Sequence, residues 1–215
     1  MNKAMELYTF FNSSASYRVR IAMALKGLDY RSIGINIRTG AQRDDAYLAL
    51  NPAGLVPALV DGASRLTQSL AIIDHLDRLH PSPLLVPAFG EDRARVLEIA
   101  QLIACDIHPL NNLRVLKFLV RDLGLNEAQK TAWYAHWIGE GFDALEALLP
   151  DHDGWCVGDQ PSLADCCLVP QVANALRLKV VLAPWPRIQR IHGFASRHPA
   201  FAEAAPERQA DYIAG

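Results

Sequence analysis

The 215-residue sequence predicts an α/β domain followed by an all-helical domain. The first 80 residues alternate between strand-like and helix-like hydrophobic periods. Three prolines within residues 81–89 (PSPLLVPAF) then interrupt all periodicity. Apolar residues after this point repeat at the spacings of three and four that are typical of helices. We therefore divide the chain into residues 1–82, a linker at 83–89 and a helical domain at 90–215.

The first domain begins with a strand, a helix and a second strand. Apolar residues 6–10 predict the first strand, and residues 15–26 predict a helix that Gly27 ends. Alternation of isoleucine with smaller or polar residues over 33–37 predicts a second strand. A short helix is expected near residues 44–50.

A hairpin and a helix complete this domain. The pair Asp61-Gly62 predicts a turn between strands at 57–60 and 64–67. Ser69 is expected to cap a helix that runs to His80. The order of these elements favours a four-stranded mixed sheet with helices on its faces.

The second domain shows only helical periods. Residues 128–149 predict a long helix, Ser162 and Asp165 resemble a capping box, and a further helix is expected near 187–196. Pro109 is expected to kink an earlier long helix. That helix carries an apolar stripe formed by Val96, Ala100, Ile103, Ile107 and Leu110.

Composition excludes several classes of function. Hydrophobic residues make up 51% of the chain and charged residues 20%, so we expect a packed core. A net charge of −2 gives no general attraction to nucleic acid or to an anionic membrane. The start of the chain does not resemble a signal peptide, and neither the four cysteines nor the histidines outside residues 106–114 have metal-ligand spacing. The expectation is a cytoplasmic protein with reduced thiols and no metal.

The segment Asn12-Ser13-Ser14-Ala15 lies between the first strand and the first helix. Hydroxyls and free N–H groups at a helix N-terminus bind anions, and a thiol held there is stabilised as a thiolate. Serine is also a favoured N-cap, so a purely structural role is the alternative. Arg18 and Arg20 favour a functional role because cations in the first turns oppose the helix dipole, although a solvated surface pair would also explain them.

Two more segments of this domain suit a peptide ligand. Leu55-Val56-Pro57 opens a hairpin strand, and a cis bond there would turn the N–H and C=O of Val56 outward to pair with an extended peptide. Gln68-Ser69 begins the next helix and forms a second anion site suited to a carboxylate. An ordinary trans proline and a plain N-cap are the alternatives.

Polar side chains interrupt the apolar pattern at residues 106–114 (DIHPLNNLR). On a helical wheel His108, Asn111 and Asn112 fall within one arc. Arg114 lies near the apolar stripe, where it could contact a carboxylate or extend into solvent.

Four segments, spread in order over nearly the whole chain, resemble the zeta class of glutathione transferases. They are SSASYRVRIAMALKG, ALNPAGLVPAL, QSLAIIDHL and GDQPSLADCCLVPQVANALR. The resemblance implies a thioredoxin-like glutathione-binding domain, an all-α substrate-binding domain and a homodimer. Many members of this class have a cysteine at the position of Ala15 and an arginine at that of Asn12, so these two departures leave the substrate range open.

The resemblance also implies roles for particular residues. Ser13 would hold the glutathione thiolate, and Arg18, Arg114 and Arg177 would bind the carboxylates of a substrate. The implied cofactor-binding set is Ser13, Ser14, Ala15, Ser16, Tyr17, Arg18, Gln42, Val56, Pro57, Gln68, Ser69, His108, Asn111 and Asn112.

The implied activity is a glutathione-dependent cis–trans isomerisation. Reversible thiolate addition would convert maleylacetoacetate to fumarylacetoacetate, a step in the breakdown of aromatic compounds. A maleylpyruvate isomerase, a conjugating transferase acting on small α-halo acids, and a non-catalytic adaptor are the alternatives. Retention of Ser13, Val56-Pro57 and Gln68-Ser69 argues against the adaptor.

Overall fold

The structure, a computed structural model, describes residues 4–214 and divides into two compact units. The first unit runs to Val86 and takes in the C-terminal segment that begins at Ser196. The second unit spans Pro87–Ala195. The sequence prediction differs here, because it assigns all of residues 90–215 to one helical domain.

A four-stranded mixed sheet with strand order β2-β1-β3-β4 forms the centre of the first unit. β1 (Met5–Thr9) pairs in parallel with β2 (Tyr30–Gly34) and antiparallel with β3 (Ala58–Asp61). β3 forms the predicted hairpin with β4 (Ser64–Thr67). Gly62 lies in its turn at a φ of +59°, which glycine adopts without steric cost.

β2 begins three residues earlier than the strand predicted at 33–37. Ile35 still donates its N–H to the Thr9 carbonyl at 2.7 Å. The Asn36 side chain then accepts the N–H of Arg38 at 3.0 Å and starts a turn. The isoleucine alternation therefore reflects packing against an apolar cluster beyond the strand.

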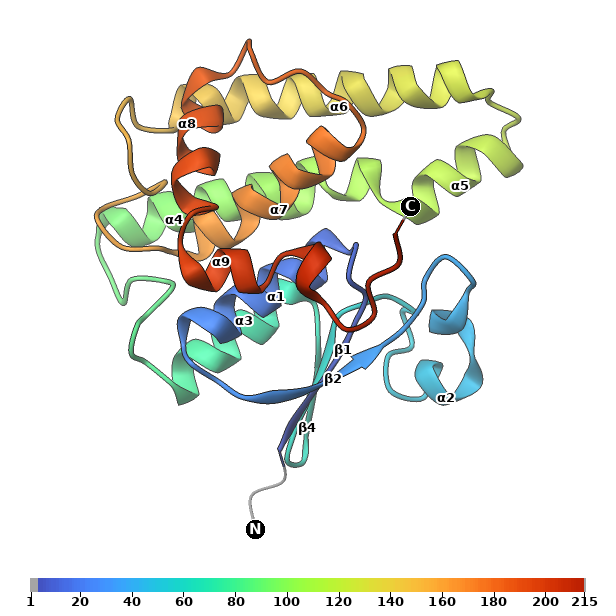
Figure 1. Cartoon of the computed structure of the whole chain (residues 1–215), viewed down its shortest axis with the longest axis horizontal. Coiled ribbons are helices and arrows are strands. Elements are labelled where there is room, and N and C mark those ends of the chain that lie inside the picture. The colour runs from blue at the N-terminus through green and yellow to red at the C-terminus, as the bar shows by residue number, and fades with distance from the viewer. Residues whose placement is uncertain (1–3, 215) are drawn as a thin grey trace. The chain divides into compact units, whose positions relative to one another are not determined.

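Three helices of the first unit pack together (Figure 1). α1 (Ser14–Leu25) contacts α3 (Ser69–Leu79), and both lie on the same face of the sheet. α9 (Pro199–Glu203), from the C-terminal segment, lies against α1. A 3₁₀ turn, η4 (Pro206–Arg208), follows it.

The chain between β2 and β3 forms two short helices, η1 (Ala41–Arg43) and α2 (Asp45–Leu48). They lie beside a small apolar cluster that also includes the end of β1. Its buried members are Phe10, Phe11, Tyr47 and Val56.

The N-terminus of α3 differs from the sequence prediction. Gln68 is the N-cap residue and makes no side-chain cap bond, and Ser69 is the first helical residue. The prediction that Ser69 caps this helix is wrong, because its Oγ accepts a hydrogen bond from Arg18 Nη1 at 3.3 Å.

The second unit is helical throughout its regular structure, as predicted. Its α-helices are α4 (Glu91–Gln101), α5 (Leu113–Arg121), α6 (Glu127–Leu148), α7 (Leu163–Arg177) and α8 (Pro186–Ala195). α4 packs against α7, which is buried along most of its length. The capping box at Ser162 is confirmed, since Asp165 accepts the N–H groups of Ser162 and Cys156, each at 2.8 Å.

The predicted long helix through Pro109 is broken into three pieces. α4 passes into a π-helical turn, η2 (Leu102–Ile107), and then a 3₁₀ turn, η3 (Pro109–Asn111), precedes α5. α6 approaches η2 closely, because a Cβ on Gly141 would lie 2.3 Å from Ile107 Cγ1. Pro109 cannot donate the next helical hydrogen bond, which accounts for the break at this residue.

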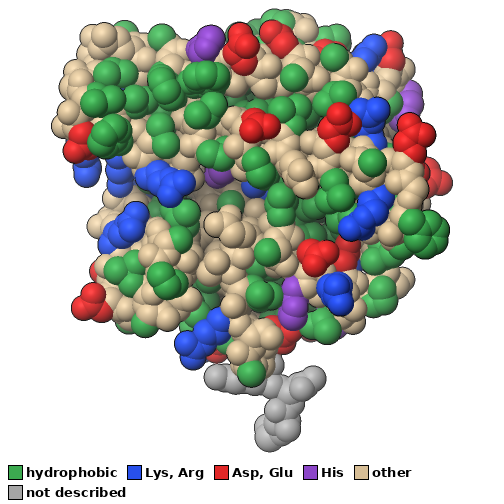
Figure 2. All heavy atoms as spheres, turned by 180° about the vertical axis from the view of Figure 1, so that it is seen from behind, with side chains coloured by type: hydrophobic (Ala, Val, Ile, Leu, Met, Phe, Trp, Pro, Cys, Tyr) green, Lys and Arg blue, Asp and Glu red, His purple; other side chains and the backbone are tan. Residues whose placement is uncertain are grey.

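Between residues 4 and 214, no helix is long and apolar enough to cross a membrane. The face drawn in Figure 2 carries acidic and basic side chains among apolar ones, in keeping with the small net charge of −2.

Candidate functional site

The Ser13 loop, residues 10–13, joins β1 to α1 in the first unit. Ser13 donates its N–H to the Phe10 carbonyl at 3.0 Å, and this bond closes a tight turn. Its Oγ accepts the N–H of Ser16 at 3.2 Å, so Ser13 is the N-cap of α1. The hydroxyl proton stays available, because the oxygen is the acceptor in this bond and no described residue accepts the proton. The loop thus presents a hydrogen-bond donor at a helix N-terminus, where a thiolate is stabilised.

The first turn of α1 supports this loop. Ser16 is buried, and its Oγ accepts the N–H of Phe10 at 3.4 Å. Ser14 is buried beside it, whereas Ala15 is partly exposed. Ser16 therefore stabilises the Ser13 loop through this hydrogen bond. This is a structural role, in addition to the predicted contact with the ligand.

Arg18 is a buried cation in the first unit, with 2% of its surface exposed. Nη1 donates to Ser69 Oγ at 3.3 Å, and Nε and Nη2 are buried without a hydrogen-bond partner among the described residues. No described carboxylate lies within ion-pair distance. A buried charge of this kind is costly, so a bound anion would stabilise it.

The N-terminus of α3 adds to this positive site. A guanidinium can only donate, so the Ser69 oxygen accepts from Arg18 and the Ser69 proton is left for another acceptor. Gln68 precedes it at a φ of +72°, a conformation that costs energy in a residue other than glycine. The structure therefore brings Arg18, Gln68 and Ser69 together at a helix N-terminus suited to a carboxylate.

The segment at Val56 presents backbone groups. The Val56–Pro57 bond is cis, and the Val56 side chain lies in the apolar cluster. The N–H and C=O of Val56 make no hydrogen bond to another described residue. Gln42 lies beside this segment, since a Cβ on Gly54 would come within 3.0 Å of the Gln42 carbonyl oxygen. Its Oε1 is buried without a partner among residues 4–214, so both residues have polar groups to offer a peptide.

Tyr17 and Arg20 face the C-terminal segment of the first unit. Tyr17 donates its hydroxyl to the Phe201 carbonyl at 3.0 Å, and burial raises the pKa of this tyrosine to about 12. Arg20 Nε donates to the Ala204 carbonyl at 3.0 Å, and burial lowers the pKa of its guanidinium to about 10. The Tyr17 hydroxyl is thus committed to the fold, which gives no support to its predicted place in glutathione binding.

The predicted polar arc of the second unit has structural partners. Asn112 caps α5 by accepting the N–H of Arg114 at 3.1 Å, and its Nδ2 lies 3.4 Å from His108 Nε2. Asn111 is buried, and its Nδ2 donates to the Tyr134 carbonyl at 3.5 Å. Its Oδ1 has no partner among the described residues. These contacts are local to the break between α4 and α5, and a role in cofactor binding stays a prediction.

The two predicted substrate arginines of the second unit lie near helix ends. Arg114 is exposed in the first turn of α5. Arg177 is the last residue of α7 and donates to Asn174 Oδ1. The Arg177 charge also acts on the buried Tyr134, where it partly offsets the rise in pKa that burial causes. The catalytic role of both arginines stays a prediction.

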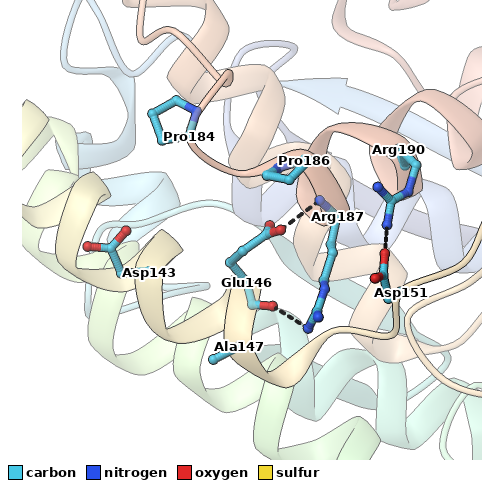
Figure 3. Close-up of a pocket in the computed structure, with 8 residues that line it drawn as sticks. All are labelled: Asp143, Glu146, Ala147, Asp151, Pro184, Pro186, Arg187 and Arg190. Carbon is cyan, nitrogen blue, oxygen red and sulfur yellow. Dashed lines mark hydrogen bonds and ion pairs between the residues drawn. The ribbon is translucent and has the colours of Figure 1, made fainter.

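A surface pocket of about 610 Å³ lies between α6 and α8 in the second unit (Figure 3). Its charged residues are all engaged in bonds, and Asp143 accepts the indole N–H of Trp185 at 2.7 Å. Glu146 accepts the backbone N–H of Arg187 at 2.8 Å, and the Arg187 side chain donates to the Glu146 carbonyl at 3.1 Å. Arg190 pairs with Asp151. These interactions hold α8 on α6 and leave no candidate catalytic group in this pocket.

The sequence prediction missed one contact to the Ser13 loop. Phe11 donates its N–H to Asp211 Oδ2 at 2.9 Å, across 200 residues of sequence. Asp211 follows the last helical turn, where no periodicity or motif marks it.

Family models match both parts of the chain. The model described as "Glutathione S-transferase, N-terminal domain" matches residues 12–79. The model described as "Glutathione S-transferase, C-terminal domain" matches residues 128–203.

Relatives of the same length are named as isomerases. A maleylacetoacetate isomerase of Pseudomonas aeruginosa is 51% identical over 96% of this chain and 98% of its own. A maleylpyruvate isomerase of a Ralstonia species is 45% identical over 96% of this chain and 99% of its own.

Solved structures agree in fold. The holo structure of a maleylpyruvate isomerase, described as a bacterial zeta-class glutathione S-transferase, has 44% identity and a TM-score of 0.93, and it covers 97% of this chain and 100% of its own. A maleylacetoacetate isomerase of Methylobacterium extorquens with bound malonate and glutathione has 36% identity and a TM-score of 0.92 over the same shares.

Proposed function

The chain belongs to the zeta class of the glutathione S-transferase family, and we propose that it is a glutathione-dependent cis–trans isomerase acting on maleylacetoacetate. The observation that carries this proposal is the Ser13 hydroxyl, whose oxygen caps α1 and whose proton is left to donate. A relative of 51% identity bears the name of this activity.

The residues of the first unit fit glutathione in their donors and acceptors. Arg18 and Ser69 offer donors to the γ-glutamyl carboxylate, and the buried charge of Arg18 favours an anion there. The N–H and C=O of Val56 can pair with the peptide as a strand would, and Gln42 Oε1 can accept one of its N–H groups.

In this proposal Ser13 stabilises the thiolate that carries out the chemistry. Glutathione supplies, when bound, a thiolate that adds reversibly to one alkene carbon, so that the former double bond can rotate before the thiolate leaves. The Ser13 hydroxyl donates to this sulfur, and the N-terminus of α1 favours its negative charge. Both effects keep the thiol ionised near neutral pH.

The substrate side of the proposal rests on arginines. Maleylacetoacetate carries carboxylates, and the guanidinium groups of Arg114 and Arg177 bind such groups in a bidentate manner. We further propose that the enzyme is cytoplasmic and works as a homodimer, as the zeta-class resemblance implies. Maleylpyruvate is the second candidate substrate, because a relative of 45% identity carries that name.

An isomerisation assay tests the proposal. Turnover of maleylacetoacetate and of maleylpyruvate is followed with glutathione, without it, and with S-methylglutathione, which keeps the peptide but has no free thiol. We expect turnover only in the presence of glutathione, and neither without it nor with S-methylglutathione. Maleylacetoacetate should turn over faster than maleylpyruvate.

Turnover without a thiol would contradict the thiolate mechanism. Faster turnover of maleylpyruvate would reassign the substrate. If glutathione binds and neither compound reacts, the isomerase proposal fails and a conjugating activity replaces it.

A further inference from the structure

We propose that Asp211 is a positioning residue for the Ser13 loop, so that the C-terminal segment sets how strongly bound glutathione is ionised. This inference rests on the proposed function, in which Ser13 holds the thiolate. It is carried by a set of contacts within the first unit that joins the end of the chain to the loop between β1 and α1.

Asp211 and Arg20 hold the two polar backbone groups of Phe11. Phe11 donates its N–H to Asp211 Oδ2 at 2.9 Å, and its carbonyl accepts from Arg20 Nη2 at 2.9 Å. Arg20 is 1% exposed, and the negative charge of Asp211 acts favourably on its cation. Phe11 lies two residues before Ser13, so this opposed pair of charges fixes the chain where it approaches the catalytic hydroxyl.

The same arginine connects the loop with the segment that carries Asp211. Arg20 Nη1 donates to the Phe10 carbonyl at 3.3 Å, and Nε donates to the Ala204 carbonyl at 3.0 Å. The Phe10 carbonyl is also the acceptor for the N–H of Ser13. A displacement of the C-terminal segment would therefore reach the Ser13 turn through a continuous chain of hydrogen bonds.

The side chain of Asp211 is closely surrounded by its neighbours. A Cβ on Gly34, at the end of β2, would lie 2.9 Å from Asp211 Cβ, so glycine leaves the room that the aspartate fills. The ring of Tyr212 packs edge-on against Phe11, with centroids 5.3 Å apart. Asp211 Oδ1 is buried without a hydrogen-bond partner among the described residues, so the Phe11 N–H is the bond that holds the carboxylate.

These contacts predict an effect on thiol ionisation in particular. The Ser13 hydroxyl must lie within a few tenths of an ångström of its productive position to stabilise a thiolate. Arg18 bonds to Ser69 at the start of α3, whereas Asp211 bonds to Phe11, so the proposed carboxylate site does not depend on the Asp211 contact. Loss of Asp211 should therefore raise the pKa of bound glutathione while leaving binding of the peptide nearly unchanged.

The test compares Asp211→Ala, Asp211→Asn and Glu207→Ala in the full chain. Glu207 is exposed on the same segment, and its negative charge also acts on Arg20. Glu207 makes no hydrogen bond to the Ser13 loop, so Glu207→Ala is a matched control that removes a charge but no contact with the loop. The ionisation of bound glutathione is titrated by the ultraviolet absorbance of its thiolate. Binding of S-methylglutathione is measured by calorimetry, and folding by thermal unfolding.

We expect Asp211→Ala to raise the thiol pKa by about one unit, with roughly tenfold slower isomerisation at neutral pH. Binding of S-methylglutathione should change less than about twofold. Asp211→Asn keeps a neutral acceptor for Phe11 and should lie between wild type and Asp211→Ala, whereas Glu207→Ala should match wild type.

An unchanged thiol pKa in folded Asp211→Ala protein would overturn the inference, and so would an equal loss of S-methylglutathione binding. If Asp211→Ala does not fold, Gly34→Ala displaces the same carboxylate, and an unchanged thiol pKa there overturns the inference equally. These readouts need no maleyl substrate. Failure of the proposed isomerase would instead appear as absent turnover in wild-type protein that still ionises glutathione.

Discussion

At the scale of single residues, two serines work through the same rule of hydrogen bonding. Ser13 accepts from a backbone N–H and Ser69 accepts from a guanidinium, and neither partner can accept in return. Each hydroxyl proton is therefore left to donate, and in the proposed function Ser13 donates to the thiolate and Ser69 to a carboxylate. Arg18 adds a buried charge beside Ser69, and we propose that this charge binds the same carboxylate.

Arg18→Gln is expected to weaken S-methylglutathione binding by about 10- to 100-fold, because a hydrogen bond to a charged group contributes about 1.5–3 kcal/mol. Ser69→Ala should have a smaller effect, and the double variant should lose less than the sum, since the two groups act on one carboxylate. Titration calorimetry measures these affinities.

Arg78→Gln is the control, because it removes an exposed cation from the other end of α3. Wild-type affinity in a folded Arg18→Gln protein would show that Arg18 serves the fold alone.

At the scale of elements, Glu146 of α6 caps the N-terminus of α8. Glu146 accepts the N–H of Arg187 at 2.8 Å (Figure 3). It also accepts the N–H of Ile188 at 3.0 Å, and so caps the first turn of α8 from another helix. Arg187 Nη1 returns a bond to the Leu149 carbonyl at 3.0 Å. A carboxylate at a helix N-terminus is favourable both as an acceptor and by its charge.

Glu146→Ala should lower the free energy of unfolding by about 2 kcal/mol, because two N–H groups lose a charged acceptor. Glu146→Gln keeps one acceptor oxygen and should lose about half as much. Denaturant unfolding measures both.

Glu140→Ala is the matched control, since Glu140 is exposed on the same helix and should change stability by less than about 0.5 kcal/mol. Equal stability of Glu146→Ala and Glu140→Ala would mean that the cap contributes nothing.

Hydrophobic period predicts most of these elements, and side-chain contacts explain where it fails. The order of strands and helices follows from the sequence, and α6 begins and ends within one residue of its prediction. β2 is misplaced because Ile35 packs beyond the strand, and α3 begins without a serine cap because Arg18 takes the Ser69 oxygen. Both causes are tertiary contacts that a local pattern does not contain.

At the scale of the whole molecule, the C-terminal segment belongs with the unit that begins the chain. Tyr17 and Arg20 bond to carbonyls of α9 and its end, and Asp211 bonds to the Ser13 loop. α9 has no strong hydrophobic periodicity, and a short irregular segment follows it. Neither feature of the sequence indicates that this part of the chain packs against the first unit. The candidate site shows the same limit, because Ser13, Val56 and Gln68-Ser69 stand in recognisable motifs and Asp211 does not.

The central claim, that Ser13 keeps glutathione ionised for isomerisation, is tested most directly by the pH dependence of kcat/KM in wild type and Ser13→Ala. Loss of a hydrogen bond to the thiolate should lower kcat/KM at neutral pH by about 10- to 100-fold and move the rising limb to higher pH. Ser13→Thr keeps a hydroxyl and should retain the wild-type profile. An unchanged profile in folded Ser13→Ala protein would contradict the account, because the thiolate would then be stabilised elsewhere.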